Sequence, residues 1–286
     1  MKKQALVISA LALASLSGCA SSTPDNSASI YNMAQNSGLN ARIEAADYVL
    51  LGEKHDNPLH HAVQATILEN GLREGDLVVF EMITSDQQPI IDRYLAGDIA
   101  DDDLAAKLLW EKSGWPDWKF YAPLFRAAKT AKANILFGSY PRKELMNMEA
   151  PMDSFETMIP ADQLAAMDED MRASHCNLLP EHMIRPMSLL QIKKDRLLAN
   201  QLLTKAPDTR AFLIAGNGHV GKERAAAYHL KKLGARNIFV LGLIEEGSEP
   251  NAWEIYSTYD AIWITEGLGK THEDYCKDLR KKFGKS

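Results

Sequence analysis

Residues 211–219, AFLIAGNGH, decide the fold of this chain together with a similar stretch at residues 48–55, YVLLGEKH. In each stretch an apolar run with the composition of a buried strand ends in a G-x-x-H motif, and a helix-like segment follows. A strand, a glycine turn and a helix form the repeating unit of open α/β folds, whose sites lie at the carboxyl ends of parallel strands. We therefore expect the two motif histidines, His55 and His219, to meet at one edge of a parallel sheet.

Strand-like and helix-like segments alternate along the chain, which predicts an α/β fold with a mostly parallel sheet flanked by helices. The expected strands are residues 48–51, 77–81, 134–138, 210–215, 237–243 and 261–264. The expected helices are residues 58–70, 87–96, 101–109, 118–131, 141–148, 161–173, 186–204 and 221–233. The strand-poor region at about 144–206 predicts a small helical subdomain inserted into this fold.

The amino terminus has the pattern of a secretory signal, because two lysines precede an apolar run that ends at Leu16-Ser17-Gly18-Cys19. These four residues are similar to a bacterial lipobox, in which the cysteine becomes the lipidated first residue. Ala20 is typical of lipoproteins sent to the outer membrane, so we expect an outer-membrane lipoprotein that faces the periplasm. The expected divisions are a signal peptide at 1–18, a lipidated tether at 19–30, an α/β domain at 31–275 and a polar tail at 276–286.

Composition excludes one class of partner and leaves one question open. The formal net charge of −6 argues against nucleic-acid binding, which requires a basic face. After removal of a signal peptide the chain is still long enough to bury the core of one sizeable domain. Besides Cys19 the chain has only Cys176 and Cys276, which could pair in an oxidising compartment or both stay free.

The glycines of the second motif also match two nucleotide-binding patterns, and both matches are weak. Residues 216–221 fit the G-x-G-x-x-G fingerprint, but the next expected strand has no acidic residue for a ribose before Glu245. Residues 216–222 fit G-x-x-x-x-G-K, but Glu223 stands where a phosphate-binding loop needs serine or threonine. Glycines there more simply allow backbone or a flat ligand to approach His219.

Four ionisable residues stand at the ends of expected strands: Glu53, His55, Glu81 and His219. In a parallel sheet they emerge at one edge, where two imidazoles and one or two carboxylates form a plausible zinc or iron site. Taken singly, each is more simply a hydrogen-bonded loop residue. Taken together they favour a site, because buried acids and histidines need partners.

Further histidines lie in two other segments. His60 and His61 begin the helix after the first motif, and its periodicity predicts His60 at the edge of the buried stripe, where it could face the pocket mouth, and His61 in solvent or facing a partner. A rim histidine could also pair with an acidic ligand such as a propionate. His175 and Cys176, with Met183 nearby, bring together imidazole and soft ligands that suit haem iron or copper, although methionines there are as easily core filler.

In combination these motifs resemble the ChaN-like haem-binding lipoproteins, in a superfamily shared with Tiki-type proteins and erythromycin esterases. The resemblance covers about residues 48–265. It rests on the lipobox, G-E-x-H-D-N at 52–57 followed by His60 and His61, the strand ending in Glu81, the segment 175–181 with Met187, Gln191 and Asp195, and G-N-G-H-V at 216–220. It implies an α/β fold with a helical subdomain, haem and iron uptake with an outer-membrane haem receptor, and a homodimer that encloses haem with tyrosine ligation.

The resemblance does not fix which tyrosine here would bind the iron. Tyr140 is the preferred candidate, because it ends an expected strand at the same edge as the G-x-x-H motifs. Arg142 and Lys143 follow it and could meet the haem carboxylates, although the stretch FGSYPR departs from the family's expected asparagine before proline. Tyr121, in an aromatic segment after Trp115, is the second candidate.

Two other functions remain open beside haem binding. Tiki-type relatives use two G-x-x-H motifs to hold a metal for peptide hydrolysis, so a divalent metal could be bound by His55 and His219, with Glu53 or Glu81 in a catalytic role. A non-catalytic adaptor lipoprotein is the third possibility, since fold alone does not establish an activity. The sequence favours a haem carrier that is not an enzyme.

Overall fold

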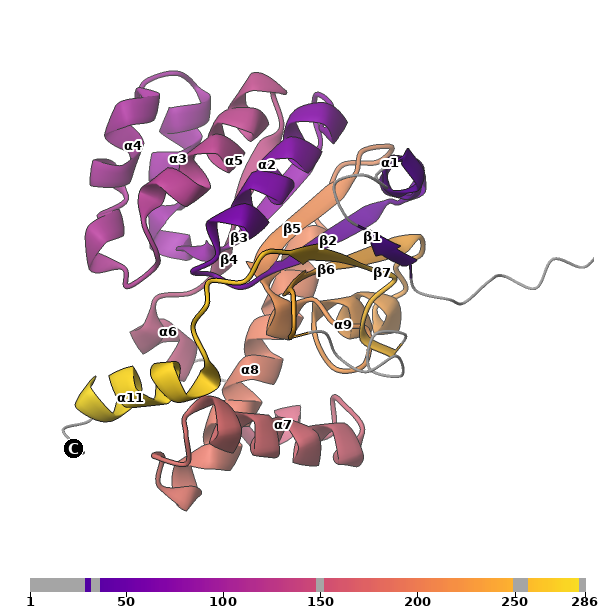
Figure 1. The fold of residues 1–286 in the computed structure, drawn as a ribbon. Coiled ribbons are helices and arrows are strands. Elements are labelled where there is room, and N and C mark those ends of the chain that lie inside the picture. Colours follow the sequence, from indigo (N-terminus) through magenta and orange to yellow (C-terminus); the bar gives the residue numbers. More distant parts are fainter. Residues whose placement is uncertain (1–28, 32–36, 148–151, 249–256, 283–286) are drawn as a thin grey trace, which may run out of the picture.

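The computed structural model describes residues 29–31, 37–147, 152–248 and 257–282, and a seven-stranded sheet lies at its centre (Figure 1). The strand order is β1-β7-β6-β2-β5-β3-β4, and every neighbouring pair is parallel. The strands are β1 (Ser29–Tyr31), β2 (Tyr48–Glu53), β3 (Leu77–Thr84), β4 (Asn134–Ser139), β5 (Ala211–Gly216), β6 (Ile238–Glu245) and β7 (Ala261–Thr265). The predicted α/β class is confirmed. The expected signal peptide and Cys19 lie outside the described residues.

Helices cover both faces of the sheet (Figure 1). One face carries α1 (Ser37–Ala45), α2 (Pro58–Gly71), α3 (Gln88–Leu95), α4 (Asp101–Lys107) and α5 (Trp118–Thr130). The other carries α8 (Glu181–Leu202) and α9 (Ala226–Lys232). The remaining helices are α6 (Arg142–Asn147), α7 (Ala161–Ser174) and α11 (His272–Lys282), with short turns η1 (Ser85–Gln87), η2 (Trp110–Lys112), η3 (Met152–Phe155) and η4 (Asn217–His219). None of the described helices is long and apolar enough to cross a membrane.

Strand β5 shows why this sequence needs cover on both sides. Phe212 and Ile214 pack into the core beneath α2 and α5, whereas Leu213 and Ala215 pack into the core beneath α8 and α9. Successive strand residues point to opposite faces of the sheet, so a strand that is apolar at every position must be covered on both faces. Full burial of each large side chain contributes about 1.5–3 kcal/mol, which makes the sandwich of helix, sheet and helix the stable arrangement.

The predicted helical insertion at about 144–206 contains α7 and the whole of α8. Leu164 and Met167 of α7 pack against Leu189 and Ile192 of α8 in a small separate core. Helix α8 begins at Glu181 rather than at the expected Pro186, which lies inside the helix. Pro186 is the sixth residue of α8, so its missing N–H removes one hydrogen bond from the second turn of the helix.

Among the described strands and α-helices, three have no counterpart among the expected ones: β1, α1 and α11. Strand β1 is only three residues long, too short for a recognisable alternation. Helix α11 is rich in charged residues and carries one buried side chain, Cys276, so its sequence lacks an apolar stripe. The expected boundary between domain and tail at 275/276 falls within this helix.

A disulfide bond joins Cys176, just after α7, to Cys276 in α11. The sequence left open whether these two cysteines pair or stay free, and the structure shows that they pair. It ties the helical subdomain to the end of the described chain across 100 residues of sequence.

Candidate functional site

Three adjacent strands bring the site residues together. Although β2, β3 and β5 are far apart in sequence, β5 lies between β2 and β3 in the sheet. Glu53 at the end of β2 is the register partner of Gly216 at the end of β5. The residues that follow these two strands therefore leave the sheet at the same edge, beside Glu81 of β3.

Glu81 is the centre of this edge. Its side chain is only 2% exposed, with Oε1 3.5 Å from His219 Nε2 and Oε2 4.0 Å from His55 Nε2. The backbone N–H of Gly216 donates to Oε2 at 2.8 Å, and the Lys194 ammonium donates to Oε1. Burial alone would raise the pKa of the Glu81 carboxyl, but the charges of His219, Lys194 and His55 hold that pKa well below its usual range. Glu81 is therefore a carboxylate at every physiological pH.

Glu53 orients the first motif histidine, His55, by a contact with its Nδ1. His55 Nδ1 lies 2.8 Å from Glu53 Oε1, which also accepts a hydrogen bond of 2.9 Å from the Tyr121 hydroxyl. Burial lowers the pKa of His55, but its hydrogen bond to Glu53 and the charges of Glu81 and Glu53 outweigh burial and raise that pKa above 6.5. The ring is thus held with Nδ1 toward Glu53 and Nε2 toward Glu81.

Asp195 plays the same part for the second motif histidine. It lies on α8, and its Oδ1 is 2.6 Å from Nδ1 of His219 in η4. Burial raises the pKa of the Asp195 carboxyl, although the charge of His219 and their hydrogen bond oppose this. Both motif histidines therefore have a carboxylate at Nδ1 and direct Nε2 toward Glu81, His55 toward Oε2 and His219 toward Oε1.

His61 adds a polar contact beneath the site. Its Nε2 is 2.9 Å from the His55 carbonyl oxygen, which can only accept, so Nε2 carries the hydrogen. Its Nδ1 lies 3.3 Å from Glu53 Oε2, and neither of these two buried atoms makes a hydrogen bond. A hydrogen bond forms between them only when one extra proton is present. The Tyr121 ring packs against His61, with the two ring centroids 4.4 Å apart.

Gly216 is required by close approach to His55. A Cβ atom built at Gly216 would lie 2.8 Å from His55 Nε2, closer than side chains tolerate. A Cβ atom at Gly52 would similarly meet Asn217 Oδ1. The glycines of the two motifs thus let the turns after β2 and β5 fit against each other.

The loop after β5 also differs in structure from a phosphate-binding loop. The expected helix at Gly221 begins instead at Ala226, the first residue of α9. A phosphate-binding glycine loop leads directly into a helix whose first N–H groups face the anion. The intervening turn removes that arrangement here.

The two histidines at the start of α2 do not lie where the helix pattern placed them. His60 is fully buried, accepts a hydrogen bond from the Lys54 N–H at 2.8 Å and lies 2.9 Å from Thr265 Oγ1. Burial lowers the pKa of His60 to about 4, so this imidazole is neutral. The prediction that His61 is solvated is wrong: it is 1% exposed, because Phe120 and Tyr121 of α5 cover that side of α2.

The expected haem-binding residues are distributed over separate places. Tyr121 is fully buried beside Glu53. Tyr140 follows β4, is half-buried and lies 5.6 Å from the Phe137 ring, with Arg142 and Lys143 exposed in the first turn of α6. His175 ends α7, where its Nδ1 is 2.9 Å from the Met171 carbonyl. Of the expected set, only Glu53, His55, Glu81, His219 and Tyr121 form one cluster.

Two members of the cluster were not predicted as site residues. Asp195 entered only through the family resemblance, and Lys194 was not singled out. A signal for both is present, since Gln191, Lys194, Asp195 and Leu198 recur at the helical spacing i, i+3, i+4 and i+7. Trp115 completes the edge, with its ring 4.9 Å from the His55 ring and 5.9 Å from the Lys194 ammonium.

Two surface hollows lie away from this edge. One, of about 350 Å³, is beside Tyr94 and Trp118. The other, of about 620 Å³, lies between α7 and α9 beside Lys231 and Tyr228. Neither is lined by the residues of the G-x-x-H motifs.

Comparisons with known proteins give one family match and several structural matches. A family model described as "Haem-binding uptake, Tiki superfamily, ChaN" matches residues 39–230, more than half of the chain. Among solved structures, ChaN of Campylobacter jejuni, described with cofacial haem binding, is 22% identical with a TM-score of 0.63, over 79% of this chain and 89% of that one. This likeness shows the fold.

Two more distant structures also align. The type III effector HopBA1 is 13% identical with a TM-score of 0.42, over 80% of this chain and 92% of that one. The toxin effector domain RRSP from Vibrio vulnificus is 15% identical with a TM-score of 0.42, over 74% of this chain and 36% of that one. Among curated proteins, none matches.

The close approach at Gly216 predicts the effect of one added methyl group. In a Gly216→Ala variant the new Cβ displaces the His55 ring from Glu81, because the ring is the movable partner. We expect a loss of about 1 kcal/mol in the free energy of unfolding, at the low end for overpacking, and a changed His55 resonance in the NMR spectrum. The control is Gly218→Ala, where a Cβ meets nothing within 4 Å. Equal behaviour of the two variants would contradict the contact.

The raised pKa of His55 predicts how stability depends on pH. The folded state holds the His55 proton more tightly than the unfolded state does, so His55 stabilises the fold below its unfolded pKa of about 6.5. This contribution disappears as pH rises through the folded-state pKa. Urea unfolding from pH 5 to 9 should therefore show a wild-type advantage over His55→Gln that shrinks with rising pH. The exposed His182, changed to Gln, is the control; a wild-type advantage over His55→Gln that grows with pH would refute the assignment.

Proposed function

The chain belongs to the haem-binding uptake family ChaN of the Tiki superfamily, and from this premise we propose that it carries haem in iron uptake. The observation that supports the proposal most directly is the family match across residues 39–230, the part of the chain that builds the sheet edge and the helical subdomain. The fold shared with ChaN of Campylobacter jejuni is consistent with it.

The cellular setting of the proposal comes from the sequence. We propose that Cys19 is lipidated and that the protein faces the periplasm from the outer membrane, where a haem receptor would be its partner. We also propose a homodimer around haem, by analogy with the cofacial haem binding described for ChaN of Campylobacter jejuni. In this setting the protein receives haem as cargo and need not transform it.

The residues after β4 have the chemistry that haem requires. Ferric haem combines an apolar ring, an iron that accepts a phenolate, and two carboxylates. Tyr140 is half-buried beside the Phe137 ring, and its hydroxyl hydrogen-bonds none of the described residues. Arg142 and Lys143 are exposed one helical turn away and can meet carboxylates. Tyr140 is therefore our candidate for the iron ligand.

The other candidates fit haem less well. Tyr121 is fully buried and donates its hydroxyl hydrogen to Glu53. Burial and the charge of Glu53 raise the pKa of Tyr121, which disfavours the phenolate that iron needs. His60 has hydrogen-bond partners at both ring nitrogens, the Lys54 N–H and Thr265 Oγ1.

A titration with haemin tests the haem proposal and the choice of tyrosine together. The chain without residues 1–19 should develop a Soret band at stoichiometric haemin. Tyr140→Phe should weaken binding at least about tenfold and shift the band, since it removes the iron ligand. Tyr121→Phe is the matched control and should bind like wild type. Absence of a Soret shift in the wild type would reject haem binding, whereas an unchanged Tyr140→Phe variant would reject only this ligand.

A second candidate function, metal-dependent hydrolysis, is favoured by the arrangement around Glu81. Nε2 of His55 and Nε2 of His219 both face Glu81, and each ring has a carboxylate at Nδ1. Carboxylate-backed imidazoles are typical of metal ligands, because the carboxylate orients the ring and strengthens its basicity. A divalent cation held there would act as a Lewis acid, with Glu53 or Glu81 available to move a proton.

Lys194 opposes such a metal in this chain. Its ammonium already donates to Glu81 Oε1 and supplies the positive charge that a cation would bring. A divalent ion would have to displace the ammonium or share the carboxylate with it. Like charges this close repel, so Lys194 lowers the affinity of the edge for metal.

Replacement of Lys194 tests this second proposal. Lys194→Met keeps the length of the side chain and removes its charge, so we expect affinity for Zn²⁺ or Mn²⁺ to rise at least about tenfold, measured by calorimetry. His55→Ala in the same background should abolish the gain. Lys107→Met, at an exposed position on α4, is the control. A wild-type protein that holds stoichiometric metal and loses peptide hydrolysis in His55→Ala would instead establish the hydrolase.

A further inference from the structure

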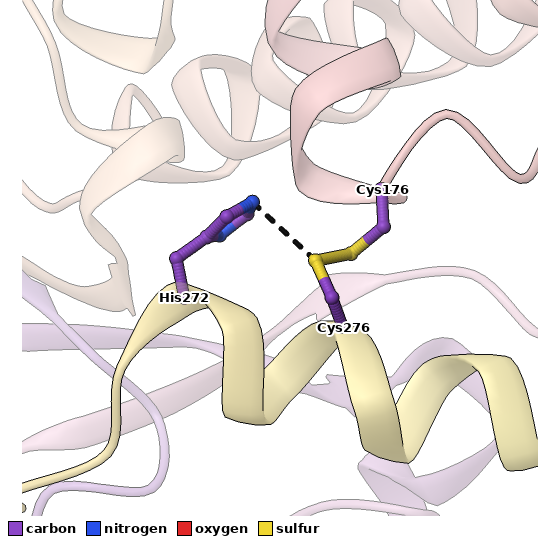
Figure 2. Close-up of side chains that lie close together, drawn as sticks. All are labelled: Cys176, His272 and Cys276. Carbon is purple, nitrogen blue, oxygen red and sulfur yellow. Dashed lines mark hydrogen bonds between the residues drawn. A yellow bond between two sulfur atoms is a disulfide. The ribbon is translucent and has the colours of Figure 1, made fainter.

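A second group of metal-ligating side chains lies away from the sheet edge. Cys176 and Cys276 form the disulfide, and His272 Nε2 is 3.4 Å from Cys276 Sγ (Figure 2). One ligand atom from each of the three lies within 4.8 Å of the others, and within the described ranges no other group of three such residues does so. Two sulfurs and an imidazole are thus gathered at one point.

Helix α11 places two of the three ligands by its own geometry. His272 and Cys276 are four residues apart and therefore lie on the same face of the helix. The helix start is fixed by Thr271 and Asp274, since the Thr271 N–H donates to Asp274 Oδ2 at 3.1 Å and the Asp274 N–H donates to Thr271 Oγ1 at 3.2 Å. His272, the first residue of α11, is held in register with Cys276 by this reciprocal cap.

The turn after α7 supplies the third ligand. Cys176 and Asn177 both adopt left-handed backbone conformations, with φ of 55° and 56°. Hydrogen bonds from the Cys176 N–H to the Ala173 carbonyl and from the Asn177 N–H to the Arg172 carbonyl, each 2.9 Å, fix this reversal. Sγ of Cys176 is thereby directed toward α11 by a turn that is also held by backbone hydrogen bonds.

Contacts other than the disulfide also hold α11 in place. The Tyr275 hydroxyl donates to Asp56 Oδ2 at 2.8 Å, and the Lys54 ammonium lies 4.7 Å from the centre of the Tyr275 ring. Cleavage of the sulfur–sulfur bond would therefore leave Cys276 close to Cys176. Their Cα atoms are 5.7 Å apart, which lets side-chain rotation open the sulfurs to the roughly 3.8 Å of a tetrahedral zinc dithiolate.

We propose that reduction of this disulfide creates a site for one thiophilic metal ion, bound by Cys176 Sγ, Cys276 Sγ and His272 Nε2. Two thiolates and an imidazole are soft and borderline ligands that suit Zn²⁺ or Cu⁺ rather than Mg²⁺ or Ca²⁺. The helical subdomain and α11 are then tied by a covalent bond in the oxidised protein and by a metal in the reduced one.

The reduction step needs a dithiol as its reductant. A reductant thiolate attacks Cys176 Sγ, because Cys176 is half-buried whereas Cys276 is 3% exposed. Cys276 leaves as a thiolate beside the His272 N–H, which can donate a hydrogen bond to it. The second thiol of the reductant then displaces Cys176, so the reductant ends as a disulfide and gives two electrons and two protons to the protein. Binding of M²⁺ releases both thiol protons.

Cobalt binding before and after reduction tests the proposal. The chain without residues 1–19, which keeps only Cys176 and Cys276, is reduced with dithiothreitol, desalted without oxygen and titrated with Co²⁺, whose thiolate complexes have a charge-transfer band in the near ultraviolet. We expect about one equivalent with this band in the reduced protein and no such band in the oxidised protein. A metal at Glu81 would bind in both states and lack the thiolate band, so it is distinguished.

Two variants make the result specific. His272→Ala preserves both thiols and should weaken Co²⁺ binding by the reduced protein about tenfold or more. His182→Ala, which removes an exposed histidine outside the group, should leave binding unchanged. A reduced protein that titrates two free thiols yet shows no thiolate band overturns the proposal. So does a reduced protein whose far-ultraviolet circular dichroism shows loss of helix, because the ligands would not stay together.

Discussion

The polar edge of this molecule depends on one buried negative charge. A carboxylate removed from water is unfavourable unless cations and N–H groups surround it. Glu81 meets this need with partners from three other segments: Lys194 on α8, His219 after β5 and His55 after β2. The same charge therefore fixes how α8 sits on the sheet and how both motif turns face each other.

The edge around Glu81 is arranged like a metal site but already holds a cation, the Lys194 ammonium. The imidazoles are oriented as metal ligands are, whereas Lys194 already occupies the role of the cation. A site whose positive charge is built into the chain is neutralised without metal. The haem proposal places the iron ligand after β4. It assigns the edge around Glu81 no role in haem binding.

The sheet and the meeting of the two motifs could be predicted because they follow from local patterns. Apolar runs that end in glycine turns specify parallel strands, and parallel strands share an edge. The partners of those residues could not be predicted in the same way. Lys194 reaches Glu81 across 113 positions of sequence, and nothing near either residue indicates the other. His60 and His61 are both buried because α5 and β7 lie over them, which the pattern of α2 alone does not encode.

The choice between Tyr121 and Tyr140 shows the same limit, since aromatic neighbours are present at both positions. Only packing separates them: Tyr121 is enclosed and bonded to Glu53, whereas Tyr140 is half-buried at the end of β4.

The bond between Cys176 and Cys276 also closes the chain into a covalent ring that contains β5, β6 and β7, while β2, β3 and β4 lie outside it. Because β5 sits between β2 and β3, the ring is threaded into the middle of the sheet rather than attached at its border. A protease that cuts once within the ring leaves a single covalent molecule, and its two pieces separate only after the sulfurs are reduced.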